Sequence, residues 1–348
     1  MMAWKKFWAM TMGGALGLGV ILFAAVVVVD PYDSLFISPP LARVPITQNQ
    51  RFSYPALARS SGFDSAVIGT STSRLLRPDK LGESLGGGFV NLSMNSATAY
   101  EQSRIFALFA RHHPRPATVV FAIDVVWCVE GKTPAKFTER PFPPWLYDDN
   151  PWNDLLHLFN FPTLEETGRL IAYFLGLRAP RQGLDGYRNF LPPESEYDLE
   201  KVQRGIYGDQ GPRPRRLEGE PVDIAAALRA GWNFPTHDLL RGMLSALPEE
   251  TVKIILFVPY HHFLQPPPGS RGAAIWRECK RRLTAMAGAF ANSHVLDFMT
   301  PSKITLADEN YWDVLHYNRA TADRIVELIA QGVRQGRGEP GYFDYLGP

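Results

Sequence analysis

Three short segments, which contain Ser71, Asp313 with His316, and Asp124, hold residue types that could take part in acyl transfer at a serine. Ser71 ends a Gly69-Thr70-Ser71 turn directly after an apolar run. Asp313 and His316 stand three residues apart, a spacing that places both side chains on one side of a turn. A histidine can take the proton of a serine hydroxyl while an aspartate fixes its tautomer. The pattern predicts Ser71 as nucleophile, His316 as general base and Asp313 as its orienting partner.

Each of these segments also has a purely structural interpretation. Gly, Ser and Thr clusters after strands commonly form turns or helix caps. An Asp-x-x-His segment can be a local hydrogen bond with no further use. Asp124, near the end of the apolar run 118–126, needs a partner if it is buried, and it either bonds across the site or caps a loop. Function is therefore indicated by the combination and not by any single motif.

Alternating apolar runs and helical patterns surround these segments. Short apolar runs rich in β-branched residues predict strands at 64–69, 88–92, 118–126, 252–259 and 294–298. Helical spacing of apolar residues predicts helices at 98–112, 222–246, 270–290 and 318–334. Strands that alternate with helices of this length predict an α/β fold, with a parallel sheet covered by helices on both faces. The predicted catalytic segments then follow strands at their carboxyl ends, where such sheets build their sites.

The middle of the chain interrupts this alternation. Residues from about 130 to 221 are rich in Pro, Gly and aromatic residues and predict a long insertion, with a helix around 163–177. Such insertions form functional lids or solvated decorations. Three aromatic residues could stack on sugar rings or pack the insertion: Trp145, Tyr147 and Trp152. A basic cluster could face an anionic polymer or solvent: Arg213, Arg215 and Arg216.

The N-terminus predicts a membrane anchor. No charged residue occurs from Phe7 to Val29, which is long enough to cross ~30 Å of hydrocarbon as a helix. Lys5 and Lys6 precede this run, so the N-terminus is expected in the cytoplasm and the rest of the chain outside. A cleaved signal peptide and a buried core helix are the alternatives. The predicted organisation is a cytoplasmic stub and transmembrane signal anchor over 1–33, a linker over 34–60, one domain over 61–335 with its insertion, and a tail over 336–348.

Composition excludes several classes of protein. The 36 Lys and Arg residues balance 35 Asp and Glu residues in a chain of 348, and the net charge of +1 gives no expectation of a nucleic-acid partner. The two cysteines, Cys128 and Cys279, exclude a disulfide framework and a cysteine-based zinc cluster. Their number predicts two inert buried thiols, with one bridge as the alternative.

Taken in order, these motifs resemble the SGNH (GDSL-like) hydrolase superfamily. Within it, the chain is similar to the membrane-anchored bacterial members of the AlgJ/AlgX O-acetyltransferase and DltD type. The resemblance covers roughly residues 62–128 and 250–330 and implies a three-layer, flavodoxin-like fold. It also implies that Ser71, Asp313 and His316 form the catalytic triad. No cofactor and no metal is expected for this chemistry.

The resemblance also implies an oxyanion hole, with two departures from the family pattern. In the segment Asn91-Leu-Ser93-Met-Asn95-Ser96, Ser93 stands where the family has a glycine. Asp124 stands where the family has an asparagine, and a carboxylate donates a hydrogen bond only when protonated. The implied donors are the N–H groups of Ser71 and Ser93 and the Asn95 amide, or else hydrolase activity is weak or lost.

A further polar turn follows the run 252–259. Tyr260 and His261 resemble a segment of the anchored members, and these residues could contact an acyl donor or a glycan. The adjacent pair His261 and His262 could instead be a surface feature, and no third ligand with metal-binding spacing accompanies it.

The expected function is serine acyl transfer, as an O-acetyltransferase or an acetylesterase, on an envelope or exported polysaccharide outside the cytoplasmic membrane. The resemblance implies an acyl donor delivered by a multi-spanning membrane acyltransferase partner. The alternative is a catalytically silent module that binds a glycan or an assembly partner.

Overall fold

The computed structural model describes residues 2–148, 150–214, 220 and 222–347. The chain forms two compact units, each of which combines segments distant in sequence. The N-terminal unit consists of Met1–Ala56 and Pro141–Leu184, and the sheet unit consists of Leu57–Arg140 and Asp185–Pro348. The predicted insertion over 130–221 is therefore divided between the two units. Part of its predicted basic cluster, Arg215 and Arg216, lies outside the described residues.

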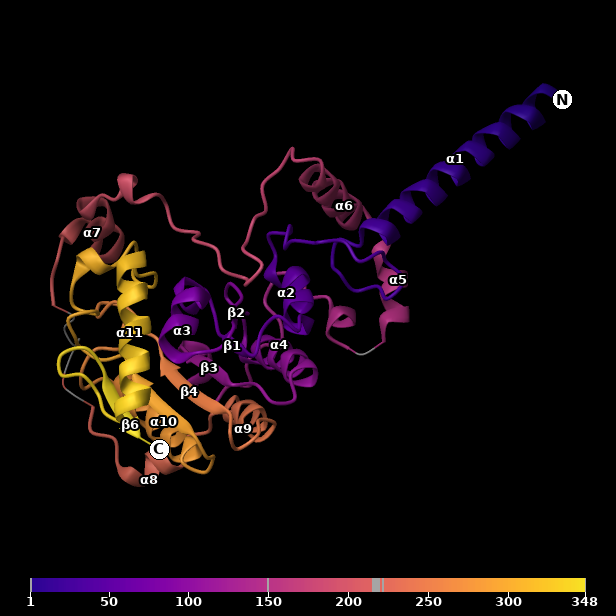
Figure 1. Cartoon of the computed structure of the whole chain (residues 1–348). Coiled ribbons are helices and arrows are strands. Elements are labelled where there is room, and N and C mark those ends of the chain that lie inside the picture. The colour runs from indigo at the N-terminus through magenta and orange to yellow at the C-terminus, as the bar shows by residue number, and fades with distance from the viewer. Residues whose placement is uncertain (1, 149, 215–219, 221, 348) are drawn as a thin grey trace. The chain divides into compact units, whose positions relative to one another are not determined.

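The sheet unit contains a six-stranded, mostly parallel sheet (Figure 1). Its spatial order is β2-β1-β3-β4-β5-β6, in which only β6 runs antiparallel to its neighbour. The strand bounds are Ser65–Ile68 (β1), Phe89–Asn91 (β2), Thr118–Ile123 (β3), Val252–Phe257 (β4), Ser293–Asp297 (β5) and Asp344–Gly347 (β6). The five predicted strands are confirmed, and nearly all of their residues are buried, as in a sheet covered on both faces. The strand β6 was not predicted and lies in the segment expected as a tail over 336–348.

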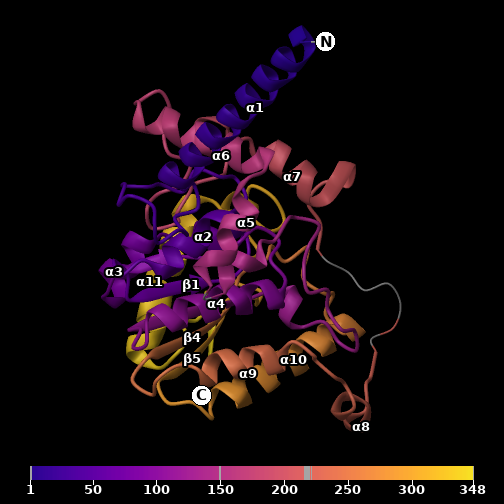
Figure 2. The same ribbon diagram turned by 90° about the vertical axis from the view of Figure 1, so that its right-hand side faces the viewer.

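Helices cover both faces of this sheet (Figures 1 and 2). Contacts group α3 with α11, and α9 with both α4 and α10. These helices have the bounds Pro78–Leu85 (α3), Ala99–His112 (α4), His237–Ser245 (α9), Arg271–Ala287 (α10) and Arg319–Gln335 (α11). The sheet unit also contains the helices Leu199–Tyr207 (α7) and Ala226–Ala230 (α8). The chain is thus a mixed α/β protein, as predicted.

Local signals explain where several helices begin and end. Helix α4 begins at a capping box, in which Thr98 accepts from the Glu101 N–H and the Glu101 side chain accepts from the Thr98 N–H. Helix α11 ends at Gly336, which has the left-handed conformation that favours glycine at this position. The prediction of a single helix over 222–246 is wrong. Pro235 disfavours helical geometry in the residue before it, and the segment forms α8 and α9 instead.

The N-terminal unit is built around α1 (Met2–Val29). Within α1, Ala3–Val29 has a mean hydropathy of 2.5 in its most apolar window and is long and apolar enough to span a membrane. Helices α5 (Pro151–Leu158) and α6 (Phe161–Phe174) belong to the same unit. The predicted linker over 34–60 contains a helix that the sequence analysis missed, α2 (Gln50–Arg59).

The aromatic residues predicted to stack on sugars lie in the N-terminal unit. Tyr147 is fully buried and its hydroxyl donates to the Arg51 carbonyl at 2.9 Å, which excludes sugar stacking there. Trp145 stacks on His157 with ring centroids 5.3 Å apart. Trp152 is 64% exposed.

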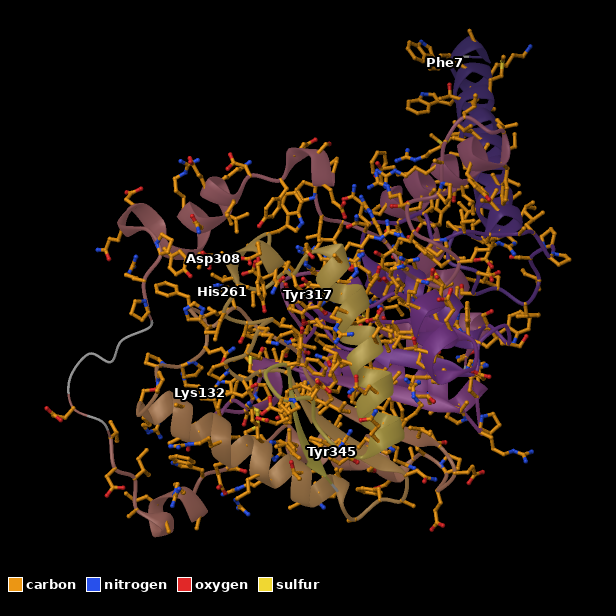
Figure 3. The ribbon with its side chains drawn as sticks, turned by 60° about the vertical axis from the view of Figure 1, so that its left-hand side comes forward. Phe7, Lys132, His261, Asp308, Tyr317 and Tyr345 are labelled. Atoms are coloured by element: carbon orange, nitrogen blue, oxygen red, sulfur yellow. A yellow bond between two sulfur atoms is a disulfide. The ribbon has the colours of Figure 1, made fainter. Side chains whose placement is uncertain are left out.

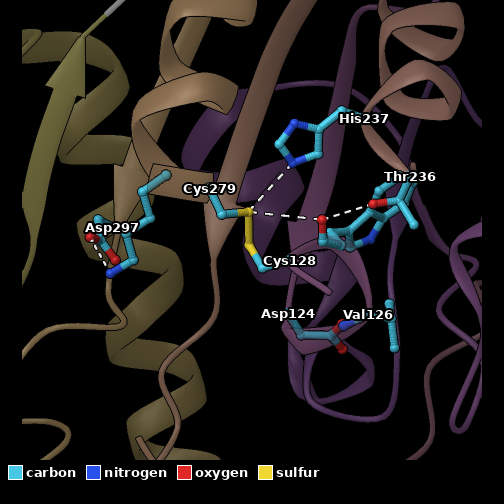
Figure 4. The surroundings of a disulfide bond; sticks show 9 residues. Asp124, Val126, Cys128, Thr236, His237, Cys279 and Asp297 are labelled. Atoms are coloured by element: carbon cyan, nitrogen blue, oxygen red, sulfur yellow. Dashed lines mark hydrogen bonds and ion pairs between the residues drawn. A yellow bond between two sulfur atoms is a disulfide. The ribbon is translucent and has the colours of Figure 1, made fainter. Parts of the chain in front are cut away.

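A disulfide joins Cys128 and Cys279 in the sheet unit (Figure 4). The prediction of two inert thiols is therefore wrong. The turn that follows β3 brings Cys128 against the middle of α10, with a Cα–Cα distance of 5.6 Å. Nearby, the Thr236 hydroxyl donates to the Trp127 carbonyl at 2.8 Å and attaches the start of α9 to the same turn. The bridge thus links the turn after β3 to α10, and its two cysteines are 151 residues apart in sequence.

Candidate active site

The candidate nucleophile lies on a tight turn at the carboxyl end of β1. A side chain at Gly69 would place its Cβ 2.2 Å from the Ser73 hydroxyl and 2.7 Å from the Ala122 Cβ, so this position accepts only glycine. A 3₁₀ turn, Ser73–Leu75, follows directly. Ser71 is partly exposed between these features. The turn therefore presents a serine hydroxyl at the point where β1 lies beside β3.

Asp313 and His316 lie in a short hairpin before α11. An antiparallel bridge pairs Tyr311 with Tyr317, and the Trp312 N–H donates to the His316 carbonyl at 2.8 Å. The Tyr317 hydroxyl, which is fully buried, donates to the Thr72 carbonyl at 2.7 Å. This last bond attaches the hairpin directly to the serine turn.

The structure brings Ser71, His316 and Asp313 into a hydrogen-bonded chain. His316 Nε2 lies 2.9 Å from the Ser71 hydroxyl, and His316 Nδ1 lies 2.7 Å from Asp313 Oδ2. Asp313 Oδ1 accepts from the N–H groups of Leu315 and His316 at 2.7 and 2.8 Å. Burial raises the pKa of Asp313, but the His316 and backbone bonds outweigh this effect and hold that pKa below its usual range. An ionised Asp313 can orient the imidazole toward Ser71.

Asp124 lies beside this turn and is 3% exposed. Its Oδ2 pairs with the Thr70 hydroxyl, and its Oδ1 accepts from the Val126 N–H at 3.2 Å. Both partners are uncharged, and burial raises the pKa of Asp124 to about 6. Burial therefore favours the uncharged form of Asp124, whose partner Thr70 directly precedes the candidate nucleophile.

The segment after β2 supports the serine turn in a way that the sequence analysis did not foresee. Asn91 is buried and donates from Nδ2 to the Ser73 and Leu76 carbonyls, both at 2.9 Å. Asn91 Oδ1 accepts from the Ser93 N–H at 3.0 Å, and the Ser93 hydroxyl lies 2.9 Å from that of Ser73. The contacts of Ser93 therefore do not support it as an oxyanion donor, because its N–H is engaged inside the turn. An asparagine at the end of a predicted strand was the available signal for this role.

The Asn95 amide is oriented by a residue that the sequence analysis also missed. The Arg74 guanidinium, which is 3% exposed, donates from Nη1 to Asn95 Oδ1 at 2.7 Å. The same guanidinium lies 4.9 Å from the ring centroid of Phe190. Phe190 also packs edge-on against His316, with centroids 5.4 Å apart. Arg74, Phe190 and Asn95 therefore extend the site beyond the triad.

Tyr260 and His261 are both buried, which does not support their predicted contact with an acyl donor or a glycan. Tyr260 is 7% exposed, and burial raises its pKa well above the usual value. His261 is fully buried, and its Nε2 lies 3.0 Å from Asp308 Oδ1 (Figure 3). The Tyr207 hydroxyl donates to the same carboxylate oxygen at 2.6 Å, and the His261 N–H donates to the Val314 carbonyl at 3.1 Å. His261 thus supports the hairpin that contains Asp313 through its backbone bond to Val314.

A cavity of about 530 Å³ reaches Asp313 and His316, although Ser71 is not in its lining. Its lining includes Phe190, Val202, Trp312, Asp313 and His316. A larger cavity of about 880 Å³ lies along α10 and has neither Ser71 nor His316 in its lining. We assign the candidate substrate site to the smaller cavity, because it reaches the imidazole that contacts Ser71.

Comparisons with protein-family models, curated proteins and solved structures find no match to this chain. Among the described residues, no group of three or more His, Cys, Asp or Glu side chains could hold a metal ion.

Proposed function

We propose that this protein is a membrane-anchored, extracytoplasmic serine acyl-transfer enzyme, an O-acetyltransferase or acetylesterase acting on an envelope or exported polysaccharide. The observation that carries the proposal is the chain of contacts from Ser71 through His316 to Asp313. These distances suit proton transfer from the serine hydroxyl to a base that is oriented by a carboxylate.

In the proposed reaction, the Ser71 oxygen attacks the carbonyl carbon of an acetyl ester and its proton passes to His316 Nε2. The tetrahedral intermediate collapses, the ester bond breaks, and His316 returns the proton to the leaving oxygen. A sugar hydroxyl or water, deprotonated by His316, then attacks the acetyl carbonyl on Ser71. The bond to the Ser71 oxygen breaks, and His316 returns the proton to that oxygen. Asp313 stabilises the imidazolium in both halves. The Ser71 N–H and the Asn95 amide are the candidate oxyanion donors.

We also propose an SGNH-type, flavodoxin-like architecture for the sheet unit. The strand order β2-β1-β3-β4-β5 supports this assignment, as does the placement of Ser71 at the point where the strand order reverses. The chain order of serine, aspartate and histidine is the order of that superfamily's motifs.

The proposed location is the cytoplasmic membrane, with α1 as a single-pass anchor and the N-terminus in the cytoplasm. Lys5 and Lys6 precede the apolar segment and support this orientation. The disulfide between Cys128 and Cys279 supports an oxidising compartment for the sheet unit. Acetyl transfer there would need a donor delivered across the membrane, for which a multi-spanning acyltransferase is the proposed partner.

The test uses the purified full chain in detergent with 4-nitrophenyl acetate. We expect release of nitrophenolate and a covalent acetyl group on the peptide that contains Ser71, detected by mass spectrometry. Ser71→Ala should abolish the acetylated peptide, whereas the control Ser96→Ala, which changes an exposed serine on the neighbouring loop, should retain it. An acetylated peptide that persists in Ser71→Ala would refute the assignment of the nucleophile.

One observation favours a second candidate function, a silent module that binds a glycan or an assembly partner. Asp124 places a buried carboxylate beside the serine turn, and an ionised carboxylate would repel an oxyanion. A silent module should form no acetyl-Ser71, and Ser71→Ala should leave its ligand binding unchanged.

A further inference from the structure

Helix α6 buries a polar face and exposes an apolar one. Its inward face, at most 8% exposed, consists of Thr163, Glu166, Thr167 and Leu170. Its outward face includes Leu175, the residue directly after the helix. The large apolar side chains of this face are exposed by 79% (Phe161), 38% (Ile171) and 67% (Leu175). Water favours the opposite arrangement, and an exposed apolar face of this kind marks a surface that something else covers.

The anchor helix gives the depth of this face in a membrane. From Phe7, the first residue after Lys6, a hydrocarbon layer of ~30 Å takes about 20 residues and ends near Val26. Phe23 then lies about one helical turn inside the hydrocarbon. The Phe23 ring packs edge-on against Phe159, with centroids 6.0 Å apart. Because Phe159 links α5 to α6, this link lies at the edge of the hydrocarbon layer.

Helix α6 is fixed to the end of α1 and crosses it instead of running alongside it (Figures 1 and 2). Val29 and Leu170 belong to one buried apolar cluster. The last carbonyls of α1 are also held, because Ser38 Oγ donates to Val27 at 2.7 Å and Arg43 Nε donates to Val29 at 2.8 Å. If α1 crosses a bilayer, α6 must therefore lie along the bilayer surface.

Further exposed aromatic residues surround the same end of α1. Phe36 packs against Trp152 with centroids 4.6 Å apart, although the two side chains are 56% and 64% exposed. Leu156, on the same helix as Trp152, is 84% exposed. Aromatic side chains concentrate where hydrocarbon meets headgroups. Glu165 and Arg169 form an ion pair at the flank of the apolar face of α6, a suitable pair for the headgroup layer.

We propose that α5, α6 and Phe159 form a membrane-interface element. The outward face of α6 contacts acyl chains of the leaflet at the C-terminal end of α1, and the Glu165–Arg169 pair lies among the headgroups. The ligand is the lipid bilayer, and the binding mode is that of an interfacial helix added to a spanning one. This inference goes beyond acyl transfer and requires only that α1 spans the membrane.

The test reads the depth of single cysteines in the full chain, reconstituted at one copy per lipid nanodisc. The two native cysteines are joined, so an introduced cysteine is the one site for a thiol-reactive bimane. Ile171→Cys and Leu175→Cys probe α6, Val20→Cys in α1 is the hydrocarbon control, and Glu200→Cys on α7 is the water control. Brominated lipids quench labels in the bilayer, and iodide quenches labels in water.

We expect quenching by brominated lipid at Ile171 and Leu175 to be comparable with that at Val20 and several-fold greater than at Glu200. Iodide should act in the reverse order. Iodide quenching at both α6 positions equal to that at Glu200 would overturn the proposal. Protection from both quenchers would also overturn it, because protein would then cover the face. Absence of lipid quenching at Val20 would overturn the proposal, because α1 would then not span the membrane. That result would also contradict the proposed membrane anchor, but it would not affect the proposed chemistry at Ser71.

Discussion

The substitution Asp124→Asn should stabilise the protein at neutral pH and leave its stability nearly unchanged in mild acid. Asp124 is buried, and its described partners are the Thr70 hydroxyl and the Val126 N–H. Burial raises its pKa from the usual 3.8 to about 6, so the folded chain binds this proton more tightly than the unfolded chain does. Between these two pKa values the folded state holds more protons. The free energy of unfolding therefore falls as pH rises through that window, and it stays lower above pH 6.

The magnitude follows from the size of the pKa shift. A shift of about two units corresponds to roughly 3 kcal/mol of destabilisation once Asp124 is fully ionised. An asparagine has nearly the same shape, can donate from Nδ2 to Thr70 and can accept from the Val126 N–H. Asp124→Asn should therefore raise the free energy of unfolding by up to about 3 kcal/mol above pH 6, and by much less near pH 4.

The assay is urea unfolding of the full chain in detergent, followed by tryptophan fluorescence at several pH values from about 4 to 8. The matched control is Asp308→Asn, which changes an aspartate with the opposite pKa shift. Burial raises the pKa of Asp308, but hydrogen bonds from Tyr207 and Gln203 outweigh this effect and hold that pKa below its usual value. Asp308→Asn should therefore lower the free energy of unfolding at neutral pH. A gain at Asp124→Asn that does not vary with pH, or a loss at neutral pH, would refute the reasoning.

Three further predictions concern the triad, its support and the disulfide. Asp313→Asn should lower kcat/KM for 4-nitrophenyl acetate by about 10³–10⁴, because an amide favours the wrong imidazole tautomer; a loss below tenfold would contradict the triad. Asn91→Ala should lower the free energy of unfolding by about 1–3 kcal/mol in urea titrations, since it removes the buried hydrogen bonds of Asn91 to the Ser73 and Leu76 carbonyls. Cys279→Ala should lower it by about 2–5 kcal/mol, and reductant should reproduce that loss in the native chain but not in the variant.

The sheet was predictable because short segments of the sequence indicate most of its strands. The segments that form β1, β3 and β4 are rich in apolar and β-branched residues, although β4 includes Lys253, and such segments are typical of strands buried on both faces. The last strand, β6, has no such run, and its antiparallel pairing with β5 depends on the tertiary fold. The disulfide was not predictable for the same reason, since its cysteines meet only when α10 packs near the end of β3.

The candidate site was predictable only in part. Ser71, Asp313 and His316 have residue types and spacing that indicate their chemistry, and the structure brings them together. The burial of His261 could not be predicted from the sequence, because its contact with Asp308 joins residues 47 positions apart. The contact of Phe190 with His316 likewise depends on a loop whose sequence carries no functional motif.

The central claim is that His316 activates Ser71. The most direct measurement treats the full chain with a fluorophosphonate probe and maps the adduct by mass spectrometry, beside Ser71→Ala and His316→Ala. The account predicts an adduct on Ser71 in the native chain and none in either variant. A folded native chain without an adduct on Ser71, or an adduct of equal yield in His316→Ala, would contradict the claim.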